Sequence, residues 1–402
     1  MGPLDGLRIL DLTTVLMGPY ATQILGDYGA QVIKVEAPGG DVVRQIGPSR
    51  SPDMGPLYLN ANRSKRDIAL DLKNEKSREA ILKLVEDADI LVTNIRPRAM
   101  ARLGLSYEEL AAVNPRLIYA ALVGYSQAGP YAERPAYDDL IQGGSCIAHS
   151  FVRAGGKPAY VPAAIADRIV GISAINAILA AVIERSRSGI GQKVEVPMFE
   201  TMVSMVMSDH MGGLTFDPPM DSGGYARHLS RDRRPYQTRD GYVCALIYND
   251  GHWQRFFKEI GRSDIPENDN RFASFSSRMA NIDFVYASLG EIIRTKTTAE
   301  WLEVFERADV PAMPMHSFES VIEDPHLDAT GFFQTVDHPT EGKLRQMAVP
   351  ACFSRTPAKP ERLAPRLGEH GPEILSEVGF SDVEIAELQR CGALCVMNED
   401  KE

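Results

Sequence analysis

Residues 158–184, PAYVPAAIADRIVGISAINAILAAVIE, join a proline-containing loop to a long apolar segment that begins beside one carboxylate, Asp167. Apolar residues recur there at helical spacing and over most of the circumference, which predicts a helix that is buried on nearly all sides. Pro162 just before the segment is typical of a helix start. This pattern leaves two interpretations of Asp167 open. One is an N-terminal cap of the helix, and the other is a nucleophile that the helix end keeps ionised.

The composition is that of an ordinary globular protein. Of the 402 residues, 44% are hydrophobic and 24% are charged, and the length suggests about two domains. No apolar run reaches the ~20 residues of a membrane helix, and the N-terminus lacks a signal-peptide pattern. The net charge of −11 disfavours binding to duplex nucleic acid. The five scattered cysteines fit a reducing cytoplasm, and without a His or Cys cluster they do not predict a metal site.

Short apolar strands alternate with amphipathic helices through the first half of the chain. This alternation predicts an α/β fold in which helices cover a parallel sheet. Such sheets bind ligands at the carboxyl ends of their strands. We expect strands at 8–12, 31–36, 90–95 and 117–123, and helices at 20–28, 76–87 and 107–113.

The basic loops of this half point to an anion site. The loop after the first strand lacks the GxGxxG pattern of dinucleotide-binding folds. Residues 37–44, APGGDVVR, place a flexible turn before Arg44, which is either a phosphate ligand or a solvated surface arginine. Residues 60–66, NANRSKR, and 94–102, NIRPRAMAR, are each explained by solvated charge. Together, in an acidic protein, they predict a shared site for a ligand with several phosphates.

The composition changes at Gly212, where a turn-rich and basic stretch begins. We therefore expect a large domain in residues 1–211, a linker in 212–239, and a smaller, mostly helical domain in 240–325. The long loop 124–150, rich in Gly, Ser and Tyr, leads towards Asp167, and long loops of this kind often carry function.

Ordered motifs run along nearly the whole chain, from residue 4 to residue 388. They are LDGLRILDLT at 4–13, GPYATQILGDYGAQVIKVEAPGGD at 18–41, NRSKRDIALDLK at 62–73, NIRPRAMARLGLSYEEL at 94–110, RPAYDDLIQGGS at 134–145, Ala166-Asp167, GQKVEVPMFE at 191–200 and APRLGEH at 364–370. In their order and combined length they closely resemble the class III coenzyme A transferase family, also called the CaiB/BaiF family.

The resemblance implies a specific architecture. It is a Rossmann-like large domain built on a parallel sheet, with a smaller α+β domain. Residues 326–402 would return to complete the large domain, and two chains would form an interlaced homodimer.

The resemblance also implies a reaction. Asp167 takes the place of the family's nucleophile, and coenzyme A passes from an acyl-CoA to a small carboxylic acid through aspartyl anhydride and aspartyl-CoA thioester intermediates. Coenzyme A is then a substrate, and no permanently bound cofactor and no metal are implied. We expect a cytoplasmic enzyme that binds neither nucleic acid nor membrane.

By similarity, CoA would lie along the strand ends of the large domain. The expected contacts come from Val15, Leu16, Asn94, Arg96, Arg102 and Tyr137, with Arg63, Lys65 and Arg66 as weaker candidates for the nucleotide. Two departures argue against formyl-CoA as the substrate. Some family members carry Gln where this chain has Leu16, and the glycine run that covers some formyl-CoA sites is absent, with Gly223-Gly224 a poor substitute.

Two rival functions follow from the same residues. An α-methylacyl-CoA racemase would use a histidine together with Asp167, but the histidine position is Tyr137, and His149 lies outside the motif. A non-catalytic CoA-binding protein would not need Asp167. The acids exchanged are not specified, although four arginines near the start of the smaller domain suit a second carboxylate if they are not simply solvated: Arg227, Arg231, Arg233 and Arg234.

Overall fold

A computed structural model describes residues 1–396. The chain divides into two compact units. Unit 1 comprises residues 1–145, 161–203 and 326–402, and unit 2 comprises residues 146–160 and 204–325. The stretch 212–239, predicted as a linker, contains helical and strand elements that belong to unit 2. These units are regions of dense contact, and the domain boundaries themselves stay a prediction.

Unit 1 is built on a seven-stranded sheet within the described residues, in the order β12-β3-β2-β1-β4-β5-β6. All neighbouring pairs are parallel except β12 with β3. The predicted parallel α/β fold is therefore confirmed. The order of β3 to β6 is that of a Rossmann fold, whose strand order reverses between β1 and β4. The strands are β1 (Arg8–Leu12), β2 (Gln31–Glu36), β3 (Lys65–Leu70), β4 (Ile90–Thr93), β5 (Ile118–Val123), β6 (Lys193–Pro197) and β12 (Leu394–Cys395).

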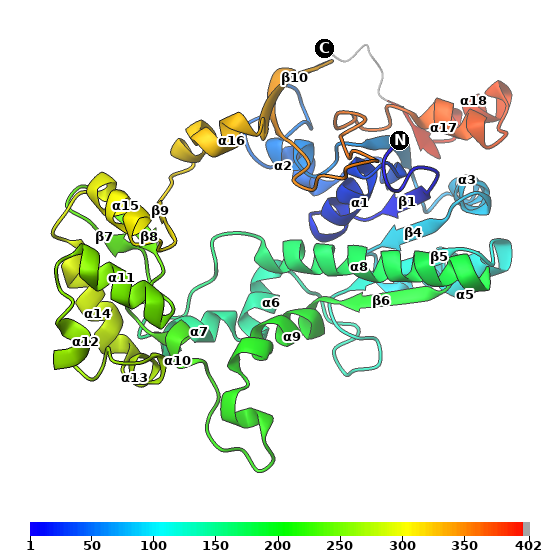
Figure 1. The fold of residues 1–402 in the computed structure, drawn as a ribbon. Coiled ribbons are helices and arrows are strands. Elements are labelled where there is room, and N and C mark those ends of the chain that lie inside the picture. Colours follow the sequence, from blue (N-terminus) through cyan, green and yellow to red (C-terminus); the bar gives the residue numbers. More distant parts are fainter. Residues whose placement is uncertain (397–402) are drawn as a thin grey trace. The chain divides into compact units, whose positions relative to one another are not determined.

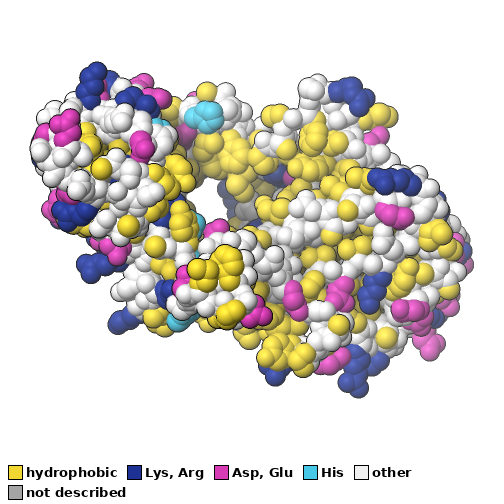
Figure 2. All heavy atoms as spheres, turned by 60° about the horizontal axis from the view of Figure 1, so that its bottom comes forward, with side chains coloured by type: hydrophobic (Ala, Val, Ile, Leu, Met, Phe, Trp, Pro, Cys, Tyr) yellow, Lys and Arg dark blue, Asp and Glu magenta, His cyan; other side chains and the backbone are white. Residues whose placement is uncertain are grey.

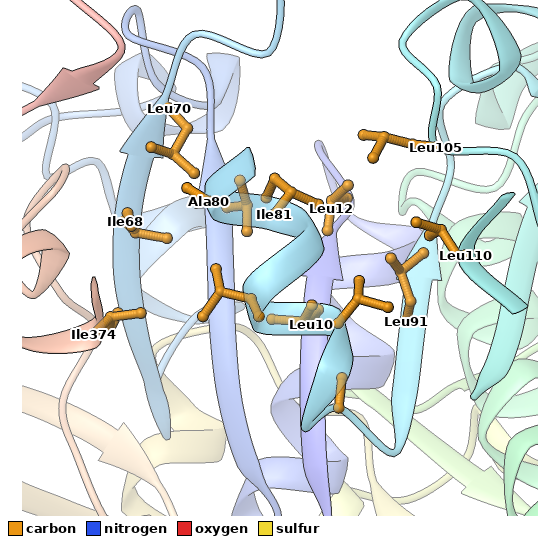
Figure 3. Close-up of a cluster of buried hydrophobic side chains, with 14 of the residues drawn as sticks. Leu10, Leu12, Ile68, Leu70, Ala80, Ile81, Leu91, Leu105, Leu110 and Ile374 are labelled. Carbon is orange, nitrogen blue, oxygen red and sulfur yellow. The ribbon is translucent and has the colours of Figure 1, made fainter. Parts of the chain in front are cut away.

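Helices cover this sheet in unit 1 (Figure 1). Buried side chains of the strands pack against α3, α5, α17 and α18 in one apolar cluster that includes Leu10, Leu91 and Ile374 (Figure 3). A hairpin of β10 (Phe333–His338) and β11 (Gly342–Met347) also belongs to unit 1. The helices are α1 (Met17–Asp27), η1 (Val42–Gln45), α2 (Pro56–Leu59), α3 (Glu75–Glu86), α4 (Pro97–Arg102), α5 (Tyr107–Val113), α6 (Asp138–Gly144), α8 (Ile165–Ser188), α17 (Gly371–Glu377) and α18 (Asp382–Arg390), with α16 (Pro325–Ala329) at the boundary.

Helix α8 is less buried than its sequence predicts. Its buried residues form one stripe at i, i+4 spacing, from Ala166 through Val170 and Ala174 to Ile178, whereas Ile172 and Ile183 are 46% and 54% exposed. The helix is long and apolar enough to pass a test for membrane spans, but core helices of soluble proteins pass the same test. The prediction of burial on nearly all sides is wrong for the single chain, because α1, α6, β5 and β6 cover only part of the circumference.

Unit 2 is mostly helical and has an aromatic core of its own. Trp253, Phe256, Trp301 and Phe305 pack there with ring centroids 5.6–6.2 Å apart. A small antiparallel sheet has the order β7-β8-β9. The elements are α7 (Ile147–Arg153), η2 (Gly212–Thr215), α10 (Ala226–Leu229), β7 (Tyr236–Gln237), β8 (Tyr242–Ala245), α11 (Asp250–Glu259), α12 (Ile265–Asn268), α13 (Phe275–Ala280), α14 (Ile282–Ile293), α15 (Thr298–Arg307), β9 (Ala312–Pro314) and η3 (Ser320–Glu323), while α9 (Met198–His210) runs from unit 1 into unit 2.

Candidate active site

Asp167 lies in the first turn of α8. The N-cap residue is Ala164, and no side chain caps this helix end. Asp167 therefore does not fill the capping role that its position in the sequence left open. Its carboxylate is partly buried, and no hydrogen bond or ion pair joins it to a side chain in residues 1–396. A carboxylate left unpaired near the positive end of a helix is available to react.

A second carboxylate holds the backbone of Asp167 in place. Asp138, the first residue of α6, accepts a hydrogen bond from the Asp167 backbone N–H through Oδ2 at 3.0 Å. The other oxygen of Asp138 accepts from Gln142 Nε2 at 2.5 Å. Gln142 is fully buried and accepts from the Val161 backbone N–H at 2.8 Å. The loop before α8 and the first turn of α8 are thus both tied to α6.

This arrangement makes the carboxyl of Asp167 hard to ionise. Burial raises the pKa of Asp167 to about 6, and the nearby charge of Asp138 adds to the increase. Arg168 acts in the opposite direction, but its guanidinium stacks on the Tyr20 ring, 4.3 Å from the centroid. A carboxylate with a raised pKa is more basic and hence a better nucleophile near neutral pH.

Helix α1 packs against α8 one turn beyond Asp167. A Cβ atom on Gly171 would lie 2.8 Å from the Met17 carbonyl oxygen, so only glycine permits this approach. The contact brings the start of α1, and the loop that precedes it, beside the first turns of α8.

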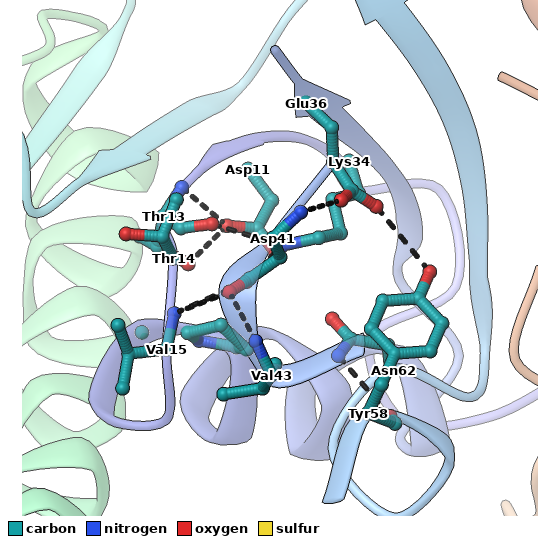
Figure 4. A network of polar contacts seen from close by, with 12 residues as sticks. Asp11, Thr13, Thr14, Val15, Lys34, Glu36, Asp41, Val43, Tyr58 and Asn62 are labelled. Carbon is teal, nitrogen blue, oxygen red and sulfur yellow. Dashed lines mark hydrogen bonds and ion pairs between the residues drawn. The ribbon is translucent and has the colours of Figure 1, made fainter. Parts of the chain in front are cut away.

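That loop, residues 13–16, follows β1 and is held by side chains from neighbouring strands (Figure 4). Val15 has φ of 70°, a strained conformation for a β-branched residue. Its backbone N–H donates to both carboxylate oxygens of Asp41 at 3.1 Å, and Lys34 Nζ donates to the Thr13 carbonyl at 2.9 Å. In Figure 4 Val15 lies on the side of the loop towards α8, drawn in pale green. Hydrogen bonds from the side chains of Asp41 and Lys34 therefore hold the backbone of this loop.

The loops after β1 and β4 also bind each other. Asn94 Oδ1 accepts from the Thr14 backbone N–H at 3.0 Å, and Asn94 Nδ2 donates to the Thr14 carbonyl at 2.9 Å. These loops stand where the strand order reverses, the position at which open α/β sheets bind ligands.

The predicted CoA contacts differ in what they offer a ligand. Arg96 and Arg102 are exposed at the two ends of α4, and neither guanidinium has an ion pair within the described residues. Tyr137 is 65% exposed and directly precedes Asp138. Leu16 is buried, and the Asn94 amide is engaged by Thr14, so these two shape the loop rather than offer free polar groups.

Several other cations that the sequence suggested for phosphate binding are paired within the fold. Arg44 is buried against Glu36, with 2.6 Å between Nη2 and Oε1. Arg63 pairs with Asp27 at 2.8 Å, and Arg66 pairs with Glu377. Carboxylates therefore balance these three charges within the fold. Arg63 lies just before β3 and Arg66 near its start, and the sequence analysis missed this strand. Their part in a shared anion site stays a prediction.

Lys65, in the basic stretch 60–66, is buried although the sequence pattern indicated solvated charge. Its ammonium is buried, and burial lowers its pKa to about 8. It donates to Asp11 Oδ2 at 2.9 Å. Although burial opposes ionisation of Asp11, Lys65 and Lys34 lower the pKa of this carboxyl to about 2. A local pattern of charges cannot reveal partners that lie 54 residues away.

Asp138, Gln142 and Asp41 were not singled out by sequence reasoning. Asp138 and Gln142 lie in the motif RPAYDDLIQGGS, from which only Tyr137 was assigned a role. Asp138 and Gln142 are four residues apart in α6, as their hydrogen bond requires, and this spacing was the available signal.

Comparisons with known proteins identify the family of the chain. Residues 4–371 match the sequence model of the protein family described as CoA-transferase family III. The chain is 34% identical to the succinate–glutarate CoA-transferase of Agrobacterium fabrum, with 94% of this chain and 96% of that protein covered. It is 32% identical to a formyl-CoA:oxalate CoA-transferase of Rhodopseudomonas palustris, covering 97% of each. A solved CaiB/BaiF family protein from Brucella suis is similar with a TM-score of 0.79 and 33% identity, covering 94% of this chain and 99% of that one. The chain therefore belongs to the class III coenzyme A transferase family.

Proposed function

We propose that this protein transfers coenzyme A from an acyl-CoA to a free carboxylic acid, with Asp167 as the nucleophile. The observation that carries the proposal is the unpaired, partly buried carboxylate of Asp167, whose backbone Asp138 holds at 3.0 Å. The relatives named for CoA transfer support the reaction class. Tyr137 stands where a racemase would need its histidine, which argues against that function.

Each step would exchange a carboxylate for a thiolate. An Asp167 carboxylate oxygen attacks the thioester carbonyl, and the carbon–sulfur bond breaks to leave a mixed anhydride and CoA thiolate. The thiolate attacks the aspartyl carbonyl and releases the first acid, which leaves an aspartyl-CoA thioester. The acceptor carboxylate attacks that thioester, and the thiolate then attacks the acceptor's carbonyl in the new anhydride. Asp167 is regenerated, and the sequence consumes no proton.

For the CoA site we propose the carboxyl ends of β1 and β4. The fixed loop of Val15 and Leu16 would line the pantetheine path, with Asn94 holding that loop. The unpaired guanidiniums of Arg96 and Arg102 suit the phosphates. Tyr137 would contact the acyl end, because the next residue, Asp138, binds Asp167.

We also propose that two chains assemble as an interlaced homodimer. The exposed apolar residues of α8, including Ile172 and Ile183, support an interface, since large apolar patches usually mark contacts. Figure 2 shows hydrophobic side chains grouped between charged ones on the face that it presents. Sedimentation velocity tests this, and a single species of 44.2 kDa would contradict it. The free cysteines support a cytoplasmic location, with acyl-CoA and a small acid as the partners.

The reaction is tested by the transfer of CoA between succinyl-CoA and glutarate. We expect glutaryl-CoA to form, and Asp167→Ala to reduce kcat/KM by at least about 10³-fold. Asp139→Ala, which removes an exposed neighbour on α6, is the matched control and should keep most activity. Transfer that survives in Asp167→Ala would refute the nucleophile. Solvent deuterium entering the α position of a branched acyl-CoA, without transfer, would instead indicate the racemase.

A further inference from the structure

An arginine without a hydrogen-bonded partner follows Asp167 in the chain. Arg168 is half-buried in the first turn of α8, and its guanidinium lies over the Tyr20 ring of α1, 4.3 Å from the centroid. Within residues 1–396, no hydrogen bond or ion pair joins this guanidinium to another group of the protein. Its five N–H donors therefore have no protein acceptor, although polar groups that are removed from water normally find one.

A second arginine of α8 shows the contrast. Arg185 is 6% exposed, and its guanidinium pairs with Asp89 Oδ1 at 2.8 Å. It also donates to the backbone carbonyls of Asp89 and Arg116, both at 3.1 Å. Arg185 thus ties α8 to neighbouring segments of unit 1, which is a structural role. Arg168 has no acceptor of this kind, so its donors are left for a ligand.

Arg168 and Asp167 lie on the side of α8 that faces α1. They precede Gly171 by three and four residues, a spacing that places them on the same helix face as this glycine. A Cβ atom on Gly171 would lie 2.8 Å from the Met17 carbonyl oxygen and 3.4 Å from the Tyr20 ring. Burial shifts the pKa of Asp167 and of Arg168 towards the neutral form, and the charge of each opposes the shift of the other. The guanidinium is thus within electrostatic reach of the reacting carboxylate.

We infer that Arg168 binds the carboxylate of the free acid beside Asp167. The inference rests on the proposed function for its place in the reaction. Guanidinium groups bind carboxylates in a bidentate manner, and stacking on Tyr20 orients this one in advance. When Asp167 carries CoA as a thioester, its negative charge is lost. Arg168 then attracts another anion without competition from Asp167.

The acceptor acid attacks from this bound position. One of its oxygens forms a bond to the aspartyl carbonyl carbon, and the carbon–sulfur bond breaks with its electron pair going to the CoA thiolate. Arg168 neither gains nor loses a proton, because arginine stays charged near neutral pH. The same contact holds the first acid as it leaves, since that step is the reverse of this attack. Arg168 thus recognises the reacting carboxylate, which all acid substrates share.

The test measures calorimetrically how pentanoate binds to the full-length Asp167→Asn protein, whose neutral side chain stands for the aspartyl group of the thioester. We expect pentanoate to bind, and the addition of Arg168→Gln to weaken binding by about tenfold or more, because charge-assisted hydrogen bonds are lost. Arg187→Gln, which changes an exposed arginine in the last turn of α8, is the matched control and should change the affinity less than twofold. Pentanamide, the neutral analogue, should bind weakly and equally to all of these proteins. Equal pentanoate binding with and without Arg168, or no binding at all, would overturn the inference.

Glutarate and free CoA show which anionic group Arg168 binds. Arg168→Gln should weaken the binding of glutarate and pentanoate by the same factor, because both acids carry the reacting carboxylate. A loss for glutarate alone would assign Arg168 to a second carboxylate, a loss for CoA would assign it to a phosphate, and either result would refute the inference.

In the active protein, Arg168→Gln should raise the KM for the acid by about tenfold and change the KM for succinyl-CoA less than twofold. Arg168→Lys keeps the charge and should recover part of the loss. An increase in the KM for succinyl-CoA alone would contradict the inference.

Tyr20→Leu covers the case in which Arg168→Gln does not fold. This substitution removes the ring under the guanidinium and leaves Asp167 in place. It should weaken pentanoate binding several-fold, and unchanged binding would overturn the inference. If the natural protein transfers no CoA while Asp167→Asn binds acids through Arg168, the proposed function fails and the binding result stands. If it transfers CoA and Arg168→Gln has an unchanged KM for the acid, only the inference fails.

Discussion

Two buried carboxylates in unit 1, Asp11 and Asp167, have opposite surroundings. Asp11 at the end of β1 contacts the ammonium of Lys65 and the hydroxyls of Thr13 and Thr22, and its pKa falls to about 2. Asp167 has burial and the charge of Asp138 around it, and its pKa rises to about 6. Both acids are partly or wholly removed from water, but only Asp11 accepts a hydrogen bond from an ammonium group, whereas the Arg168 guanidinium near Asp167 stacks on the Tyr20 ring.

The difference separates a structural carboxylate from a reactive one. Asp11 neutralises Lys65, while Lys34 and Asp41 hold the loop of Val15, so this network stabilises the fold and fixes the shape of that loop. Asp167 keeps an oxygen free and basic, which favours attack on a thioester. A reactive carboxylate of this kind lowers the stability of the fold.

The largest effect on stability is expected when the buried ion pair of Asp11 and Lys65 is broken. Asp11→Asn would leave the buried Lys65 without its carboxylate, and we expect the free energy of unfolding to fall by about 3–5 kcal/mol. Urea denaturation followed by circular dichroism measures it. Asp87→Asn, in a surface pair with Arg8 whose side chains are 56–63% exposed, should change it by less than about 0.5 kcal/mol. Equal changes in the free energy of unfolding for the two substitutions would show that Asp11 does not have this structural role.

At Asp167 the same substitution, Asp to Asn, should raise the free energy of unfolding instead of lowering it. The pKa of Asp167 is raised from 3.8 to about 6 on folding, so ionising it costs stability as the pH rises between these values. Asp167→Asn should therefore be more stable than the natural protein by about 1–3 kcal/mol at pH 8. The advantage should shrink below pH 6 and vanish below about pH 4. Urea unfolding across this pH range measures it, and a variant that is less stable at pH 8 would contradict the comparison.

A smaller effect is expected from Asp138. Asp138→Asn keeps a hydrogen-bond acceptor for the Asp167 backbone N–H and removes one negative charge. The pKa of Asp167 should fall, and the acidic limb of the profile of kcat/KM against pH should move down by about half a unit to one unit. Asp139→Asn, an exposed neighbour on the same helix, is the control and should leave the profile unchanged. No shift in Asp138→Asn would assign the raised pKa of Asp167 to burial alone, and an equal shift in Asp139→Asn would show that the effect is not specific to Asp138.

The sheet could be predicted from the sequence where its strands are apolar. The pattern predicts β1 and β2 with their observed bounds, Arg8–Leu12 and Gln31–Glu36. It misses β3, because that strand begins with Lys65 and Arg66, and a charged start reads as a loop. Burial of a lysine depends on a carboxylate elsewhere in the chain, which periodicity does not report.

The site could be predicted only in part for the same reason. Asp167 was identified by its motif and its place at a helix start. Its burial, and the hydrogen bond that its backbone N–H donates to Asp138, depend on contact with α6, 29 residues earlier in the chain. The overestimated burial of α8 has a related cause, because an apolar circumference does not say whether the same chain or a second chain would cover it.

In the proposed reaction Asp167 itself forms the covalent bond with CoA. The most direct measurement is tandem mass spectrometry of the protein after incubation with succinyl-CoA and no acceptor acid. We expect a CoA adduct on the peptide carrying Asp167, located at that residue and absent from Asp167→Ala. An adduct on Asp138, or transfer that proceeds with no adduct on any carboxylate, would contradict it.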